Sequence, residues 1–220
     1  MMRSPSWGLF CVAGFLACCN AAAQAQQFSA DLASSRRGAA TSVGKLRVFN
    51  DKVRIEAPDF PDGFFVSDGS NHVSHFARPN ARIFMDARQS SWLVGMFVPV
   101  DPDDPCRQWR SMAEVAGAED QNGQWRCERV GQEVIGGRDV VRYRIMVSVG
   151  REMLGWIDPA LKFPLKIQRE DGATAIVENI LEQPQPAALF EIPANFRKFN
   201  PEALIKRIKQ SDVWVEAPSP

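Results

Sequence analysis

Apolar and polar residues alternate with a period of two along much of the chain, which is typical of strands with one covered and one solvated face. Leu46 and Val48 point to one side while the lysine and arginine before them point to the other. After the Asn-Asp pair at residues 50–51 the alternation resumes with Val53 and Ile55. Because Asn-Asp favours a turn, these two segments are predicted to form an antiparallel hairpin.

The same alternation predicts further strands on both sides of one interruption. Residues 99–105 hold three prolines and three aspartates, which favours a surface loop. Residues 106–115 carry Trp109, Met112 and Val115 at a spacing of three, which predicts an amphipathic helix. Strands are predicted at residues 64–67, 73–78, 81–86, 91–97, 124–130, 139–149, 153–157, 163–167 and 174–181. With about ten strands and few helices, the fold class is mainly β (α+β), with an antiparallel, meandering sheet.

The C-terminal segment 201–220 is predicted to form a short helix and a tail. Leu204, Ile205 and Ile208 fall on one face of a helix over residues 201–210, and lysine and arginine fill other positions. We expect this helix to cap an open end of the sheet. The alternative is a helix that lies on a membrane surface.

The N-terminal segment 1–25 has the pattern of an export signal. Arg3 precedes an uncharged apolar run over residues 7–19, which is too short to span a bilayer. Ala-Gln-Ala at residues 23–25 predicts cleavage before Gln26, so a periplasmic protein is expected. The alternative is a lipoprotein box ending at Cys18, which would anchor the chain to a membrane through an acylated cysteine.

Two of the five cysteines, Cys106 and Cys127, remain after the predicted cleavage. An even number of cysteines in an exported chain predicts a disulfide between them. Its ring of roughly 22 residues would stabilise the fold by about 3 kcal/mol in the loop-entropy description. The alternative is a pair of buried free thiols.

The charge balance and the size limit the function classes. The chain has 26 lysines and arginines against 26 aspartates and glutamates, and this balance argues against nucleic-acid binding, which needs a clustered basic excess. No second apolar stretch approaches membrane-spanning length, so no membrane span is expected in the mature chain. Residues 26–200 are predicted to form one domain, which we expect to be a monomer.

No catalytic or cofactor chemistry is predicted. The two histidines, His72 and His75, would face opposite sides of a strand, which opposes chelation of a metal by the pair. There is no nucleophile elbow and no glycine-rich phosphate loop. Carboxylates near turns and strand ends form no acid/base pair in the sequence, and these are Glu128, Glu133, Asp139 and Asp158. We therefore predict that the protein is not an enzyme and carries no cofactor.

Several sequence motifs resemble those of a largely uncharacterised family of secreted bacterial proteins, related in fold to the periplasmic lipoprotein carriers LolA and LolB. In the second half these are DPC at residues 104–106, WRCERVG at 125–131, V-x-GGR at 134–138, GWIDPALKFPLK at 155–166 and QPAALFEIP at 185–193. In the first half they are FSAD at residues 28–31, GKL at 44–46 and DKVRIE at 51–56. The resemblance covers most of residues 28–200.

The resemblance implies a curved, unclosed antiparallel β-barrel wrapped around a few helices, with an apolar hollow between sheet and helices. In the carriers, such a hollow receives the acyl chains of lipoproteins. The residues expected to line it are Leu46, Val48, Val53, Ile55, Ile83, Met85, Trp92, Val94, Met96, Tyr143, Ile145 and Val147. The same residues would suit a packed sheet core equally well, and the sequence leaves both interpretations open.

Two functions follow from this reading. The first is a non-catalytic periplasmic binding or carrier protein for a hydrophobic or amphiphilic ligand, such as a lipid or lipoprotein acyl chains. The alternative is an envelope interaction module that binds a protein partner through its surface, with Trp109, Trp125, Trp156 and Trp214 as candidate contacts.

Overall fold

A computed structural model describes residues 26–36, 39, 41–87, 92–115, 125–148 and 150–209. The side chains of residues 92, 93, 115, 148, 208 and 209 are outside this description. The expected export signal over residues 1–25, the alternative anchor Cys18 and the tail with Trp214 also lie outside the described residues.

The described residues form one twelve-stranded sheet in the order β12-β6-β5-β4-β3-β2-β1-β11-β10-β9-β8-β7. All neighbours pair antiparallel except β12 and β6, which pair parallel over two residues. Since β7 and β12 lie at opposite ends of this order, the sheet is not closed, as predicted. The strands are β1 (Gln27–Ser35), β2 (Ser42–Phe49), β3 (Lys52–Glu56), β4 (Phe64–Asp68), β5 (Val73–Arg78), β6 (Ile83–Asp86), β7 (Arg126–Ile135), β8 (Arg138–Ser148), β9 (Arg151–Asp158), β10 (Phe163–Arg169), β11 (Thr174–Glu182) and β12 (Arg197–Lys198).

The N-terminal strand β1 lies in the middle of the sheet, between β2 and β11. It joins the two halves of the chain, each of which is a meander of hairpins. The predicted hairpin at residues 50–51 is confirmed, because Phe49 pairs with Lys52 and Asn50 adopts the left-handed conformation (φ 54°) that such turns need.

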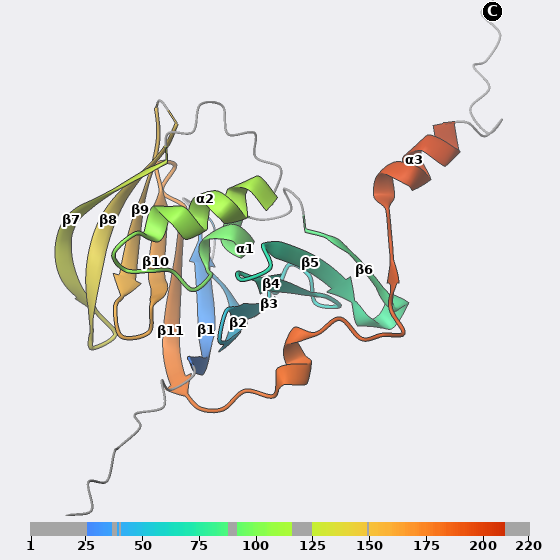
Figure 1. Ribbon diagram of the computed structural model, residues 1–220, viewed down its shortest axis with the longest axis horizontal. Coiled ribbons are helices and arrows are strands. Elements are labelled where there is room, and N and C mark those ends of the chain that lie inside the picture. The colour runs from blue at the N-terminus through green and yellow to red at the C-terminus, as the bar shows by residue number, and fades with distance from the viewer. Residues whose placement is uncertain are drawn as a thin grey trace, which may run out of the picture.

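Two helices, α1 (Trp92–Met96) and α2 (Pro105–Val115), cover one face of the sheet (Figure 1). We call this the inner face. The strand predicted at residues 91–97 is wrong, because residues 92–96 form α1. A short apolar run is compatible with either a strand or a helix, and here the contact with α2 decides: a Cβ on Gly95 would lie 4.0 Å from Cβ of Met112.

The main core lies between the inner face and these two helices. Trp109 and Met112 of α2 are almost fully buried, as the predicted helix requires, and Phe28, Phe97 and Phe163 pack in the same cluster. The predicted disulfide between Cys106 and Cys127 is present, with the two Cα atoms 5.6 Å apart. It attaches the start of α2 to the edge strand β7.

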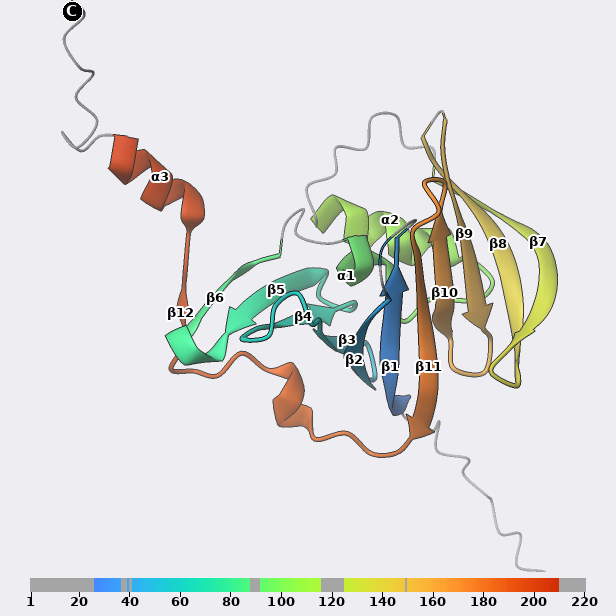
Figure 2. The same ribbon diagram turned by 180° about the vertical axis from the view of Figure 1, so that it is seen from behind.

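A second, smaller core covers the opposite face of β4 and β5. Ile192 and Phe196, from the segment after β11, pack against Phe64, Val66 and Ala77. This segment contains the short 3-10 helix η2 (Ala187–Phe190) and runs from β11 back to β12 (Figure 2). Because both faces of β4 are covered, all five of its residues are buried, and its sequence does not alternate.

The C-terminal helix α3 (Pro201–Lys209) forms as predicted, but it does not cap the sheet. Residues 201–207 are exposed, and α3 extends away from the sheet beyond β12 (Figure 1). The prediction of a cap is therefore wrong. Among the helices of the described residues, none is long and apolar enough to cross a membrane.

Candidate ligand groove

A groove of about 1240 Å³ opens at the β4–β6 end of the inner face, beside the part covered by α1 and α2. A 3-10 turn, η1 (Pro79–Ala81), joins β5 to β6 at this end. The groove also borders the loop at residues 59–63 and the chain that leads from β12 into α3. Its lining residues are Asp59, Phe60, Pro61, Asp62, Gly63, Phe65, Phe76, Arg78, Met85, Asp86, Ala87, Lys198, Phe199, Asn200, Pro201 and Glu202.

Three aromatic rings, those of Phe60, Phe65 and Phe76, form what we call the aromatic floor. Their centroids are 5.6 Å apart for Phe60 and Phe65, 5.4 Å for Phe60 and Phe76, and 4.8 Å for Phe65 and Phe76. Phe60 is 42% exposed, so the floor is accessible from solvent. Met85 pairs with Phe76 across the β5–β6 ladder and continues the apolar surface.

The aromatic floor requires a glycine beside it. A Cβ added to Gly63 would lie 2.5 Å from Cζ of Phe76 and 3.0 Å from the carbonyl oxygen of Ala77. Any side chain at residue 63 would therefore displace the Phe76 ring. Gly63 lets the loop at residues 59–63 approach β5 closely enough for Phe60 to join the other two rings.

The strand register continues this apolar surface into the main core. Leu46 pairs with Ile55, Ile55 with Phe65, Phe65 with Phe76, and Phe76 with Met85. Paired residues in a ladder project to the same face of a sheet. One cross-strand row therefore runs from the buried core to the open groove.

The charged residues at the rim are more acidic than basic. Four of the lining residues are acidic and two are basic. The acidic residues are Asp59, Asp62, Asp86 and Glu202, and the basic ones are Arg78 and Lys198. Nζ of Lys198 lies 2.9 Å from Oδ1 of Asp86, which partly neutralises both groups and ties β12 to β6. Amphiphiles with an apolar body and a polar end match a site of this kind, which is apolar inside and charged at the rim.

His75 lies next to Asp86, one of the acidic residues that line the groove. Nδ1 of His75 lies 3.5 Å from Oδ1 of Asp86, and its ring meets the edge of Phe84 at 5.3 Å. Burial lowers the pKa of His75, the charge of Asp86 opposes this, and the charge of Lys198 adds to it. The net direction is downward, so the neutral imidazole is favoured near neutral pH.

The structure divides the twelve residues predicted to line a hollow into three groups. Leu46, Val48, Val53, Ile55, Val94, Met96, Tyr143 and Ile145 are buried in the main core, and Val147 is partly buried against it. Ile83 and Met85 are half-buried on β6, and Met85 lines the groove. The side chain of Trp92 is outside the described residues. As ligand-lining residues, all twelve stay a prediction.

Sequence reasoning missed the aromatic floor itself. Phe65 and Phe76 are adjacent only because β4 pairs with β5, and Phe60 reaches them from a loop. The one usable signal was the concentration of phenylalanines over residues 60–76 around a Pro-Asp-Gly turn.

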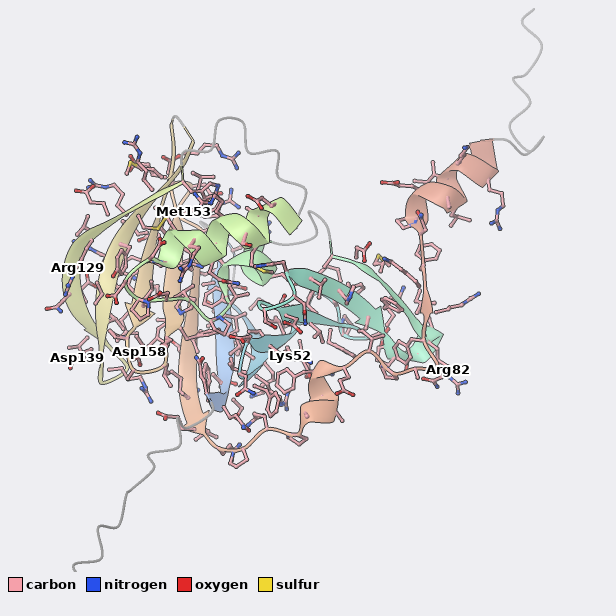
Figure 3. The ribbon with its side chains drawn as sticks, in the orientation of Figure 1. Lys52, Arg82, Arg129, Asp139, Met153 and Asp158 are labelled. Carbon is pink, nitrogen blue, oxygen red and sulfur yellow. A yellow bond between two sulfur atoms is a disulfide. The ribbon has the colours of Figure 1, made fainter. Side chains whose placement is uncertain are left out.

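Several of the polar residues considered for catalysis make hydrogen bonds within the fold. Nδ1 of His72 lies 2.8 Å from Oγ of Ser111, away from His75 on β5. Asp158 is 2% exposed, and it accepts hydrogen bonds from Arg138 and from the backbone N–H groups of Ala160 and Leu161. Figure 3 shows Asp139 and Asp158 at the same end of the sheet. Among the described residues, no group of three potential metal ligands occurs.

The other two carboxylates form cross-strand contacts. Glu133 accepts hydrogen bonds from Arg142 at 2.7 Å and from the indole of Trp156 at 2.9 Å. Glu128 accepts one from Arg144 at 3.3 Å. These contacts connect β7, β8 and β9 and are of the kind that stabilises neighbouring strands.

No family model and no curated protein matches this sequence. Among solved structures, PNGF-II has a TM-score of 0.50 at 11% identity over 84% of this chain and 33% of that chain. A LolA superfamily protein from Nitrosomonas europaea has a TM-score of 0.36 at 11% identity over 76% of this chain and 91% of that chain. MucB in complex with MucA(peri) has a TM-score of 0.39 at 15% identity over 77% of this chain and 55% of that chain.

The chain thus spans a third of the length of PNGF-II and about half of that of MucB. At such identities, a likeness concerns the fold alone. The chain is structurally similar to this LolA superfamily protein and to MucB.

Proposed function

We propose that the protein is a non-catalytic binding protein for an amphiphile, such as a lipid or the acyl chains of a lipoprotein, which it holds in the groove. The observation that carries the proposal is the aromatic floor, in which the exposed ring of Phe60 packs on the half-buried Phe76 and the buried Phe65 at the open end of a packed core. A groove with an apolar base and polar groups around it is typical of ligand-binding sites.

The groove suits the apolar part of such a ligand. Burial of an acyl chain is favourable by about 0.8 kcal/mol for each CH₂ group removed from water, before ordering costs. The volume of about 1240 Å³ lies above the range of roughly 300–1,000 Å³ of small-molecule pockets. A long, flexible chain is therefore a better match than a compact metabolite.

A periplasmic location is part of the proposal. The disulfide Cys106–Cys127 is typical of an oxidising compartment, and the expected export signal would direct the chain there. Acylation at Cys18 would instead anchor the protein and favour a receptor-like role over a shuttling carrier.

Titration of the purified protein with a fluorescent long-chain fatty acid tests this function. We expect saturable binding that Phe60→Ser weakens about tenfold, since one ring of the floor is lost. Leu181→Ser is the matched control, because Leu181 is 60% exposed on β11, outside the groove. Equal affinities for both variants and the parent chain would exclude the groove as the binding site.

A second candidate function is binding of a protein partner at the edge strand β7. Its outer edge ends the sheet order, and Val134 on it is 67% exposed. An exposed edge can accept an added strand, although the charged residues and the bulge between Arg129 and Gly131 oppose indiscriminate pairing. Of the tryptophans considered as contacts, Trp109 and Trp156 are buried and unavailable, while Trp125 is half-buried near this edge. Chemical cross-linking in the periplasm would capture such a partner.

A further inference from the structure

We propose that α3 is a membrane-contact helix, which lies on the surface of an anionic phospholipid bilayer and holds the protein there. The contact is made by residues 204–207, which lie outside the groove lining, so it does not depend on the proposed function. Of the two sequence-based expectations for this helix, the cap on the sheet is wrong. A contact with a membrane surface is the one that suits its exposed position.

The apolar side of α3 is left largely open by the rest of the described chain. Leu204 is 42% exposed and Ile205 is 53% exposed, although the apolar residues of an amphipathic helix normally pack against a partner. Isolated helices shorter than about 12–15 residues are marginal in water, and α3 has nine residues. A surface that takes up the two apolar side chains would therefore stabilise the helix.

The start of α3 is fixed to the edge of the sheet. The backbone N–H of Phe199 donates a 2.7 Å hydrogen bond to the carbonyl oxygen of Phe84 on β6. Oδ1 of Asn200 then caps the helix by accepting a 3.0 Å hydrogen bond from the N–H of Ala203. Pro201 occupies the first helical position, which proline favours. The helix therefore projects from β12 as a short arm that extends beyond the edge of the sheet (Figure 2).

The charges of this arm are mostly basic. Residues 197–207 contain four basic residues and one acidic residue, which are Arg197, Lys198, Lys206, Arg207 and Glu202. Because Lys198 is paired with Asp86, attraction to an anionic bilayer would come chiefly from Lys206 and Arg207 on α3. A second copy of this chain is a poorer partner for α3, since these two residues would meet their own like charges.

The length of α3 carries its basic residues away from the acidic rim of the groove. Nine residues give a helix of about 13 Å, at about 1.5 Å for each residue. Screening limits the reach of exposed charges to about 8 Å at physiological ionic strength. When α3 meets a bilayer first, repulsion from Asp59 and Asp62 on the rim is therefore screened more strongly than attraction to Lys206 and Arg207.

The arrangement of side chains around α3 fits a position in the bilayer interface. Leu204 and Ile205 are about 100° apart around the helix, and Lys206 and Arg207 fall on the remaining arc. A helix in the interface buries its apolar side and keeps its basic side chains among the lipid headgroups. A length of about 13 Å is too short to cross a hydrocarbon core of about 30 Å, so α3 would lie on the surface.

Docking through α3 would bring the groove close to the bilayer. Pro201 and Glu202, the first two residues of α3, line the groove. Because amphiphiles partition into bilayers, a groove held there would meet such a ligand at a high local concentration. The membrane contact would thus assist the proposed function without requiring it.

Co-sedimentation with lipid vesicles tests the membrane contact. The protein is the chain that begins at Gln26, because the apolar run at residues 7–19 would otherwise bind vesicles by itself, and every strand of the sheet follows Gln26. We expect binding at low salt to vesicles of equal amounts of phosphatidylglycerol and phosphatidylcholine. Binding should be much weaker at high salt and with pure phosphatidylcholine. No binding to the anionic vesicles, or equal binding to both kinds, would overturn the proposal.

A charge reversal on α3 locates the basic part of the contact. Lys206→Glu combined with Arg207→Glu should weaken binding to the anionic vesicles about tenfold or more. Arg110→Glu combined with Arg151→Glu is the matched control, because it changes the net charge equally at exposed residues of α2 and β9. The control should weaken binding far less, and an equal loss in both would overturn the assignment to α3.

A second pair of variants locates the apolar part. Leu204→Asp combined with Ile205→Asp should abolish most vesicle binding, whereas Val43→Asp combined with Leu181→Asp, at exposed residues of β2 and β11, should retain it. The two α3 substitutions lie outside both cores, so thermal unfolding should keep its midpoint. Retained binding by this α3 variant would overturn the proposal.

The fluorescent fatty acid separates failure of the membrane contact from failure of the proposed function. If the chain binds vesicles through α3 but does not bind the fatty acid, the membrane contact stands and the amphiphile function fails. If it binds the fatty acid but no vesicles, the function stands and the membrane contact is excluded. If α3 binds an acidic protein and no vesicles, α3 is a protein contact, which also overturns the proposal.

Discussion

The indole N–H of Trp109 donates a 2.9 Å hydrogen bond to the backbone carbonyl of Met96. This bond joins the middle of α2 to the last residue of α1, while the Trp109 ring fills the space between both helices and the sheet. The inner face is packed around this bond, and the groove opens at the β4–β6 end of the same face.

Replacement of Trp109 should loosen both helices. Trp109→Phe would leave the buried Met96 carbonyl without its partner and should lower the free energy of unfolding by about 1–3 kcal/mol. Trp109→Ala should cost about 3–5 kcal/mol, because it also leaves a cavity. Urea unfolding followed by circular dichroism measures both. Trp125→Phe, at a half-buried residue, should change stability much less, and an equal loss there would contradict this account.

Gly155 makes room for Trp109 on β9. A Cβ at this residue would lie 2.9 Å from Cδ1 of Ile145 and 3.0 Å from Cη2 of Trp109. Gly155→Ala should therefore destabilise the protein by about 1–3 kcal/mol through overpacking. Gly131→Ala is the control, because its nearest neighbour, Nη2 of Arg142, would be 3.7 Å away. Thermal unfolding of the two variants should show a lower midpoint for Gly155→Ala alone.

The disulfide Cys106–Cys127 should contribute to stability. Reduction should lower the free energy of unfolding by about 3 kcal/mol, since the bond closes a loop of about 22 residues in the unfolded chain. The measurement is chemical unfolding with and without dithiothreitol. The double variant Cys106→Ser and Cys127→Ser should match the reduced protein and show no response to reductant. A response of that variant would place the effect elsewhere.

Stability should fall as the solution becomes mildly acidic, because of His75. Burial lowers its pKa in the folded state, partly opposed by Asp86 and assisted by Lys198. A histidine with a lowered pKa contributes stability that is fully present above the unfolded value of about 6.5 and is lost as pH falls through the folded value. His75→Gln should flatten the dependence of unfolding free energy on pH below 6.5. His72→Gln, which replaces the other histidine, should retain the decline that His75 causes.

Local sequence pattern was sufficient for most strands and for the disulfide. Alternation with a period of two depends only on which face of a strand is covered, so Leu46, Val48, Val53 and Ile55 were assigned to one face and are buried there. The turn at residues 50–51 is likewise a local property. The cysteine pairing needed only the predicted export of the chain.

The sequence pattern was insufficient where it depends on a distant segment whether an apolar face is covered. The apolar run at residues 92–96 is compatible with a strand, and it forms a helix because α2 packs against it. Residues 201–209 have the amphipathic pattern of a packed helix, yet residues 201–207 are exposed. In both cases the sequence showed an apolar face without showing what covers it.

The sequence by itself determined which residues are apolar and which face of each strand they occupy, because side-chain direction repeats every two residues. Only the tertiary structure decided whether that apolar surface is packed or open. The row from Leu46 through Phe65 to Met85 is apolar throughout, but Leu46 and Phe65 are buried in the main core while Met85 lines the open groove. Which segments cover a sheet depends on long-range contacts, and these are absent from any local pattern.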